Sequence, residues 1–453
     1  MYVRSMNPVR SAAPFVAFGL LTCIPGFSAA PSPGASATLV AHSVLIRPPL
    51  GGAKPAIAEL LGVACPPRGG CWAVGDYQTA GKKTRPMVVE RSSGRWQVAV
   101  PIALPSVADP TGFASLSAIS CTSSRSCVAV GTYSSPSVGF TSGSEEPMAV
   151  LEVNGHWGRA LAIVPPSDAL RGTAGSGYAT AVACAGSDSC TILGTYANHS
   201  NVEREFRATA VTKSPGGALS RATELPFREL TGLYAGAQSI SLEGLACTSL
   251  GNCISVGSVS TGDGSNSVAV TESEDRGRWT PETAAPLPPN VTAKTSNSWL
   301  YGVACPQAVT CIATGTVQYS AQNDDTGALI EALSGQTWTW HSAPPSPRGH
   351  SILLDAVSCA TRLLCSAVGG LIAGSTSFTG TSKALVALGD ASGLISIVSV
   401  PLPNGGPGAA DSNVLRSVAC TRTGSCTAVG SESLSGATSL SFDHPVATEF
   451  NLR

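Results

Sequence analysis

Charged residues, aromatic side chains and long apolar runs are all scarce in this sequence of 453 residues. Only 12% of the residues are charged, against about 25% in typical soluble domains, and the net charge is −1. A nucleic-acid-binding protein or a polybasic membrane-surface protein needs a clustered surplus of Lys and Arg. The composition therefore excludes both classes. Beyond residue 30 no apolar run is long enough to span a bilayer, so we expect no membrane span.

The chain also lacks the sequence motifs of common enzymes. It contains no G-x-S-x-G elbow, no phosphate-binding loop and no dinucleotide-binding fingerprint. Its six His residues show no H-x-x-x-H or similar spacing, which metal ligands on one element would have. The sequence therefore assigns no catalytic residue, no metal site and no cofactor.

The first 30 residues have the pattern of a secretory signal peptide. Arg4 and Arg10 precede an apolar stretch from Ala12 to Phe27, and small residues follow at 28–30. Residues 31–36 then form a Pro/Gly/Ser linker. The sequence therefore predicts a secreted protein. The alternative is a lipoprotein signal, in which Cys23 is lipidated and anchors the mature chain.

Fourteen of the 15 Cys residues form seven pairs, all spaced C-x5-C. An even number of Cys in a secreted chain favours disulfides. Structural zinc is the alternative, but it needs four Cys or His ligands. The pairs stand about 50–60 residues apart and the His residues do not follow them. The predicted disulfides are Cys65 with Cys71, Cys121 with Cys127, Cys184 with Cys190, Cys247 with Cys253, Cys305 with Cys311, Cys359 with Cys365, and Cys420 with Cys426.

Each Cys pair marks one copy of a longer repeat. The first cysteines are 54 to 63 residues apart, and a glycine stands four residues after every second Cys, at Gly75, Gly131, Gly194, Gly257, Gly315, Gly369 and Gly430. Each repeat holds four short apolar runs bounded by turn residues, such as 60–65, 71–75, 87–90 and a run that begins at Trp96. Four strands in each of seven repeats predict an all-β, seven-bladed propeller over residues 37–453.

The two ends of the chain are out of phase with the repeat. The last copy ends with a third-strand run, Val446 to Phe450, whereas Ser43 to Pro48 resembles a fourth strand that precedes the first copy. The N-terminal strand is therefore expected to complete the last blade and to cover its exposed edge. Small residues before each first Cys fit the narrow inner strand of a blade, and each Cys pair then brackets one hairpin, with one disulfide per blade.

The run C-x-A-V-G-x-Y, followed by a Trp after the next turn, resembles a kelch-type repeat. The Tyr is present as Tyr77, Tyr133 and Tyr196. The seven copies are also similar to C-x5-C-x-A-V-G repeat proteins secreted by high-GC bacteria. The resemblance covers residues 37–453 and implies a propeller. It implies no chemistry, because no catalytic residue of a kelch oxidase or a sialidase falls on a matching position.

One position varies between the copies although its neighbours hardly change. It lies four residues before the first Cys, at Leu61, Ser117, Thr180, Glu243, Tyr301, Asp355 and Arg416. Glu243, Tyr301, Asp355 and Arg416 belong to consecutive blades, so we expect one polar arc at the axial opening. Two alternatives stay open: these side chains only solvate the channel mouth, or Glu243 and Asp355 act as the carboxylate pair of a glycosidase.

These features favour an extracellular binding or scaffold module, with a polysaccharide or a protein as ligand. Loops on a rigid frame carry most binding sites, and the loops that differ most join the second strand to the third. We expect a monomer without a nucleic-acid partner. The alternatives are a glycan hydrolase or lyase with its site in the axial pocket, and a structural envelope protein without a ligand.

Overall fold

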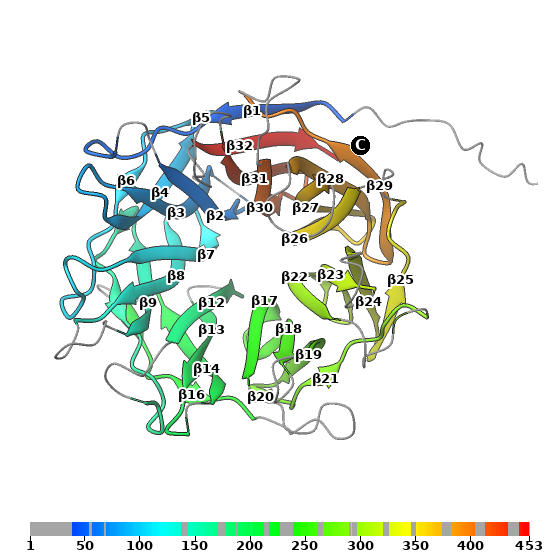
Figure 1. Ribbon diagram of the computed structural model, residues 1–453, viewed down its shortest axis with the longest axis horizontal. Coiled ribbons are helices and arrows are strands. Elements are labelled where there is room, and N and C mark those ends of the chain that lie inside the picture. Colours follow the sequence, from blue (N-terminus) through cyan, green and yellow to red (C-terminus); the bar gives the residue numbers. More distant parts are fainter. Residues whose placement is uncertain are drawn as a thin grey trace, which may run out of the picture. The chain divides into compact units, whose positions relative to one another are not determined.

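Seven antiparallel sheets of four or five strands follow one another along the chain and surround a common axis (Figure 1). The computed structural model describes residues 39–452, apart from 54–56, 68, 137–143, 171–176, 187–188, 201, 213–216, 227–238, 261–265, 290, 292–296, 320–325, 346–349, 374–381, 404–412 and 434–443. The predicted signal peptide, with Cys23, and the linker lie outside the described residues. The sheets confirm the all-β, seven-bladed propeller.

The Cys pair of each blade lies on the two inner strands or, in blade 1, directly after the innermost one. The innermost strands are β2 (Ala58–Ala64), β7 (Ala114–Ser123), β12 (Gly177–Cys184), β17 (Ser239–Ser249), β22 (Ser298–Gln307), β26 (His350–Thr361) and β30 (Asn413–Cys420). The second strands are β3 (Cys71–Gln78), β8 (Ser126–Ser134), β13 (Ser189–Ala197), β18 (Asn252–Ser260), β23 (Thr310–Gln318), β27 (Leu364–Ala373) and β31 (Ser425–Glu432).

The third strands are equally regular, whereas the outermost strands differ between blades. The third strands are β4 (Thr84–Ser92), β9 (Glu145–Val153), β14 (Glu203–Val211), β19 (Ser267–Asp275), β24 (Thr326–Ser334), β28 (Ser382–Asp390) and β32 (His444–Asn451). Blades 5 to 7 have one outer strand each, β25 (Thr337–His341), β29 (Gly393–Ser399) and β1 (Ala41–Leu45).

In blades 1 to 4 the expected fourth strand is split into two pieces of two residues. The pieces are β5 (Arg95–Trp96) and β6 (Val100–Pro101), β10 (His156–Trp157) and β11 (Leu161–Ala162), β15 (Ala218–Leu219) and β16 (Thr223–Glu224), and β20 (Arg278–Trp279) and β21 (Thr283–Ala284). Both pieces pair with the third strand of their own blade. None of the described segments is a helix that could cross a membrane.

Tight turns join the third and fourth strands. Ser93-Gly94, Asn154-Gly155 and Arg276-Gly277 have positive φ at both residues, the backbone of a type I′ hairpin turn, which matches the right-handed twist of the strands. In blade 5 Ser334 pairs with Thr337 and leaves Gly335 and Gln336 as the loop.

The N-terminal strand closes the ring as expected. β1 pairs antiparallel with β32 over five residues, from Ala41 opposite Phe450 to Leu45 opposite Val446. The innermost strand of the last blade, β30, also contacts β2 of the first blade. The first and last blades are therefore held together both at the outer edge and beside the axis.

The seven predicted disulfides are all present, one in each blade. Each joins the two strands of the inner hairpin, with Cα atoms 3.9 to 4.2 Å apart. A loop this short contributes roughly 2 kcal/mol per bridge in the chain-entropy model. Seven disulfides indicate that the chain folds in an oxidising environment. The bridges join Cys65 to Cys71, Cys121 to Cys127, Cys184 to Cys190, Cys247 to Cys253, Cys305 to Cys311, Cys359 to Cys365, and Cys420 to Cys426.

The two cysteines of a bridge differ in their surroundings. The first is half-buried in every blade, whereas the second is buried and belongs to the hydrophobic core. None of these cysteines lines the axial cavity described below, so they stabilise the blades and take no part in the candidate site. The buried second cysteines are Cys71, Cys127, Cys190, Cys253, Cys311, Cys365 and Cys426.

The hydrophobic core lies between neighbouring blades. Between blades 1 and 2, Val74 and Val88 pack against Leu116 and Val150, all four of them buried. Trp72 and Trp157 meet there edge to face, with ring centroids 5.4 Å apart. A Trp that opens an outer strand therefore packs between blades, and the aromatic side chains near the axis belong to other positions.

Candidate binding site

A cavity of about 710 Å³ lies on the axis and is lined by residues from all seven blades. This volume is within the range of small-molecule sites, roughly 300–1,000 Å³. The structure brings all four residues of the expected polar arc to one wall, and their binding of a ligand stays a prediction. The variable position of every repeat lines the cavity: Leu61, Ser117, Thr180, Glu243, Tyr301, Asp355 and Arg416.

A β-bulge turns each of these side chains toward the cavity. In blade 5, Leu300 lies opposite Gly315 and Gly302 opposite Thr314, so Tyr301 is an extra residue without a partner in the ladder. The same register shift occurs at the equivalent residue of all seven inner hairpins. A bulge re-aims a side chain locally without changing the rest of the strand. We refer to these seven residues below as the bulge residues.

The invariant glycine of each repeat makes the bulge possible. A Cβ atom added to Gly315 would lie 1.9 Å from the backbone oxygen of Trp299, and the equivalent distances in the other six blades are 1.9 to 2.3 Å. No other residue fits so close to a carbonyl. The glycine is therefore the same in every copy, whereas the bulge residue beside it is free to differ.

The residue after each bulge residue is small because it meets the next blade. A Cβ atom on Gly302 would come within 2.9 Å of the Cα atom of Ala356, the equivalent residue of blade 6. Gly62, Ala118, Ala356 and Ser417 occupy this position in four blades and also line the cavity. The wall is therefore made of backbone and small side chains, from which the bulge residues project.

The cavity has two unlike halves. Blades 1 to 3 contribute Leu61, Ser117 and Thr180, which are short or apolar. The hydroxyl of Ser117 donates to the carbonyl oxygen of Ala179 at 2.9 Å, and that of Thr180 donates to the carbonyl oxygen of Leu242 at 2.5 Å. Both bonds reach the inner strand of the next blade. This half therefore carries no charged bulge residue, and both of its hydroxyl groups are hydrogen-bonded to the backbone of the neighbouring blade.

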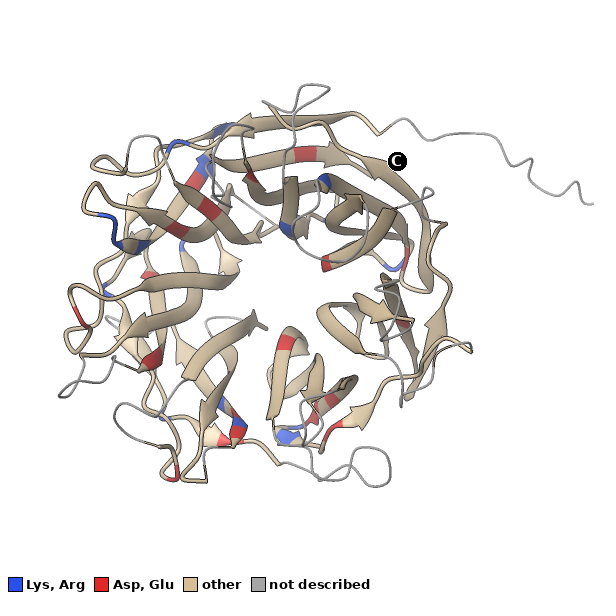
Figure 2. Ribbon diagram, viewed as in Figure 1, with Lys and Arg blue, Asp and Glu red and all other residues tan. Residues whose placement is uncertain are grey.

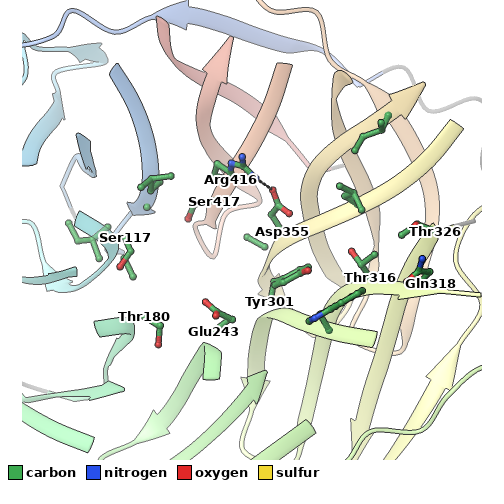
Figure 3. A pocket seen from close by; sticks show the side chains of 18 residues that line it. Ser117, Thr180, Glu243, Tyr301, Thr316, Gln318, Thr326, Asp355, Arg416 and Ser417 are labelled. Carbon is green, nitrogen blue, oxygen red and sulfur yellow. Dashed lines mark hydrogen bonds and ion pairs between the residues drawn. The ribbon is translucent and has the colours of Figure 1, made fainter. Parts of the chain in front are cut away.

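The charged half comes from blades 4, 6 and 7. Arg416 on β30 forms an ion pair with Asp355 on β26, with Nη1 3.0 Å from Oδ2 (Figure 3). Burial raises the pKa of Asp355, and the Arg416 guanidinium partly offsets this by lowering it. Few other charged positions occur on the ribbon of the inner strands (Figure 2). The two charges of the pair neutralise each other, which leaves Glu243 as the charged lining residue without a basic partner among the described residues.

Two carboxyl groups of blade 1, which are not among the described residues that line the cavity, interact with each other, and one of them interacts with Arg416. Burial raises the pKa of Glu59, and the charge of Arg416 lowers it. Burial also raises the pKa of Asp76 to about 7, and neighbouring Glu59 adds to this shift. The hydroxyl of Ser115 donates to Oδ2 of Asp76 at 2.7 Å and lowers the pKa in part. Arg416 thus interacts with one acid from blade 1, Glu59, and one from blade 6, Asp355.

Glu243 and Tyr301 lie next to each other at the cavity wall (Figure 3). The Glu243 side chain is exposed, and its Oε1 accepts a hydrogen bond from the hydroxyl of Ser241 at 2.6 Å. Burial raises the pKa of Tyr301, and the carboxyl groups of Asp355 and Glu243 raise it further. The phenol of Tyr301 therefore stays neutral beside an exposed carboxylate.

Sequence reasoning missed the extension of the cavity into blades 5 and 6. Its walls there are Trp299, Thr316, Gln318, Thr326, Leu353 and Ile372. Trp299 and Leu353 stand two residues before a bulge residue, so the period of two along a strand would have placed them on the same face. Thr316 and Gln318 follow the invariant glycine by one and three residues. Five of the seven copies carry Ser or Thr at the first of these positions, so the hydroxyl group of Thr316 was a signal that the sequence offered.

No metal site is formed within the part of the chain that the structure describes, since no three His, Cys, Asp or Glu side chains gather there as metal ligands would. The charged residues of the cavity instead pair with each other or face its space. The arrangement can bind a ligand through charge, hydroxyl groups and aromatic surface.

Comparison with known proteins identifies no family, since no family model and no curated protein matches this sequence. Among solved structures, the chain is similar to a Trypanosoma rangeli sialidase bound to the inhibitor DANA, with 11% identity and a TM-score of 0.44. The match covers 78% of this chain and 56% of the sialidase, so the chain spans just over half the length of that protein.

Two other solved structures are also similar to this chain. An ulvan lyase bound to a sulfated glucuronate–rhamnose disaccharide unit matches 73% of this chain and 78% of its own, with 11% identity and a TM-score of 0.41. A fucose-specific lectin from Aleuria aurantia matches 80% of this chain and 100% of its own, with 10% identity and a TM-score of 0.34. The kelch-like character of the repeats stays a prediction.

Proposed function

We propose that the chain is an extracellular binding module whose ligand enters the axial cavity. The observation that carries this proposal is that seven bulge residues, one from each blade, project into a single cavity while the frame around them repeats. Such a frame allows seven side chains to vary without disturbing the blades, as a site that is adapted to one ligand requires. A channel mouth that needed only solvation would not require Tyr301 or Leu61 at two of these positions.

Binding accounts for the polar residues better than glycoside hydrolysis does. A glycosidase needs two carboxyl groups that flank the scissile bond. Here Oδ2 of Asp355 is hydrogen-bonded to Arg416, which leaves Glu243 as the exposed acid of the bulge residues. Hydrolysis or lysis in the same cavity remains the second candidate, and the experiment below separates the two.

Secretion belongs to the same proposal. The disulfides indicate an oxidising environment, and residues 1–30 would direct the chain there as a signal peptide. Removal of that peptide also removes Cys23, so the mature chain would carry only the paired cysteines. A lipid-anchored form would instead keep Cys23, and the intact mass of the mature protein distinguishes the two forms.

The test is a screen of the purified mature protein on arrays of glycans and cell-wall polymers, with the mass of any product read at each spot. Retention without cleavage is the expected result and supplies the ligand class. Cleavage would favour the enzyme and direct attention to Glu243 and Asp355. Absence of retention on every spot would contradict glycan binding and favour a protein partner or a structural role.

A matched pair of variants connects retention to the cavity. Glu243→Gln removes one carboxylate from the wall and is expected to reduce retention about tenfold or more. Glu145→Gln makes the same change at an exposed residue at the start of β9, which is not among the described residues that line the cavity, and should leave retention unchanged. Equal retention by both variants would place the ligand elsewhere.

A further inference from the structure

The charge balance of the axial cavity restricts the chemistry of its ligand. Among the described residues that line it, Glu243 and Asp355 are acidic and Arg416 is the basic residue. Glu59 adds a further acidic group close enough to interact with Arg416. The wall is therefore negative on balance near neutral pH, and an anionic ligand would meet net repulsion.

The guanidinium of Arg416 is already engaged. Its Nη1 donates to Asp355 at 3.0 Å, and Glu59 stands close enough for the two charges to interact. A ligand carboxylate or sulfate at Arg416 would also approach the carboxyl groups of Asp355 and Glu59, and their repulsion would offset its attraction to the guanidinium. Arg416, the basic residue among the described residues that line the cavity, therefore offers an anion little net attraction.

The carboxylate of Glu243, in contrast to the guanidinium of Arg416, is available to a ligand. Its side chain is exposed, and Ser241 is its hydrogen-bond partner within the described residues. That bond uses Oε1, so Oε2 can accept a hydrogen bond from a ligand. The face of an aromatic ring beside a carboxylate attracts an ammonium group through charge and through the ring quadrupole. Tyr301 lies beside Glu243 (Figure 3), and Trp299 lines the same cavity.

The rest of the wall suits a hydroxyl-rich body. Ser117, Thr180, Thr316 and Gln318 supply hydroxyl groups and an amide to the cavity. Oε1 of Gln318 accepts a hydrogen bond from Asn297 at 2.8 Å, which orients the side chain and leaves its amide hydrogens as donors. Such groups bind sugar hydroxyls, whereas the hydrocarbon stem of a Lys side chain would leave them unmatched.

We propose that the ligand of the axial cavity is an amino sugar, whose protonated amine is held by Glu243 beside Tyr301 and whose hydroxyl groups meet the neutral wall. This inference rests on the proposed binding function and specifies its ligand class. It requires no group transfer, because the amine binds already protonated.

The test is calorimetric titration of the mature protein with four tetramers: glucosamine, N-acetylglucosamine, galacturonate and lysine. The first two differ only in the charge and acetylation of the amine. We expect the glucosamine tetramer to bind at least about tenfold more tightly than the acetylated tetramer and the galacturonate tetramer, with weaker binding at higher salt.

The Glu243 variant shows whether the preference arises in the cavity. Glu243→Gln should bring the glucosamine and N-acetylglucosamine affinities to within about threefold, whereas Glu145→Gln should retain the difference. Circular dichroism and thermal melts confirm that both variants fold.

Several results would overturn the amino-sugar inference. Equal or tighter binding of the acetylated or the galacturonate tetramer would show that charge does not select the ligand. Lysine binding as tight as glucosamine binding would identify a basic peptide instead. If none of the four binds, but an array ligand is lost on Glu243→Gln, the inference fails and the binding site stands. If the array is also silent, the proposed function fails as well.

Discussion

At the scale of single residues, the axial cavity combines side chains of very different environment. Arg416 and Asp355 are 36% and 18% exposed and neutralise each other, whereas Glu243 is open to solvent. Asp76 behind them is the carboxyl group near the cavity whose pKa is raised to about 7. Because this carboxyl group ionises at a higher pH in the folded state than in the unfolded state, the free energy of unfolding depends on pH.

The sign of the Asp76 effect follows from proton binding. The unfolded Asp ionises near pH 3.8 and the folded one only near 7, since burial and Glu59 disfavour the charge. Between these values the folded state binds more protons, so its free energy of unfolding falls as the pH rises. We expect Asp76→Asn to be more stable than the wild type by up to about 4 kcal/mol at pH 8, since each unit of pKa shift corresponds to about 1.4 kcal/mol, with little difference at pH 4.

Urea unfolding at pH 4, 6 and 8 measures this difference. Asn can still accept the hydrogen bond from Ser115, so the substitution removes mainly the charge. Asp275→Asn, on an exposed turn paired with Arg276, is the matched control and should change stability by less than about 0.5 kcal/mol at each pH. A variant of Asp76 that is less stable than the wild type at pH 8 would disprove the argument.

The seven bulge residues could be predicted from the sequence because their neighbours repeat so closely. A position that varies inside an invariant frame is not needed for packing, and Glu243, Tyr301, Asp355 and Arg416 accordingly line the cavity. Trp299 and Gln318 could not be found in this way, since the extension of the cavity depends on how blades 5 and 6 meet. The ion pair between Arg416 and Asp355 could not be predicted either, because spacing in the sequence gives no distance between residues of different blades.

At the scale of the strands, the device that forms the site is the inner hairpin with its bulge. The invariant glycine leaves room for the backbone carbonyl of the facing strand. The side chain of the bulge residue then points toward the axis. The sequence showed the glycine in all seven repeats but not its reason, because a bulge leaves no spacing signal of its own in a hairpin that is also joined by a disulfide.

Two adjacent glycines in blade 6 test this explanation. A Cβ atom on Gly369 would lie 2.0 Å from the backbone oxygen of Leu353, whereas one on Gly370 would lie 3.7 Å from its nearest neighbour, Val414. We expect Gly369→Ala to destabilise the protein by at least about 3 kcal/mol or to prevent folding. Gly370→Ala should change stability by less than about 1 kcal/mol.

Chemical denaturation compares the two variants, and soluble yield serves where Gly369→Ala does not fold. Because both residues lie on β27 and both gain the same methyl group, strand propensity cannot account for a difference. Equal stability of the two variants would mean that the bulge does not require the glycine.

At the scale of the whole molecule, ring closure by β1 was predicted from the phase of the repeat, since only the ends of the chain could supply the missing strand. The split outer strands of blades 1 to 4 were not predicted, because a two-residue strand leaves no hydrophobic pattern. Those strands lie far from the axis, so the difference leaves the cavity unaffected.

Loss of β1 should open the ring. A chain that begins at Pro48 lacks β1 and exposes the edge of β32, which β1 covers over five residue pairs. We expect a lower melting temperature and self-association through the free edge, detected by thermal melts and light scattering. A chain that begins at Leu39 keeps β1 and should remain monomeric. A monomeric, equally stable chain from Pro48 would show that closure does not depend on this strand.

The central claim is that the bulge residues form one binding site, and a titration of the array-selected ligand into a triple variant tests it most directly. The variant Glu243→Gln, Asp355→Asn, Arg416→Gln removes both charges of the ion pair together, so neither member of that pair is left as an unpaired charge. Calorimetry should show affinity at least about 100-fold weaker than that of the wild type, with the melting temperature largely preserved. Affinity within about twofold of the wild type would contradict the assignment of the site.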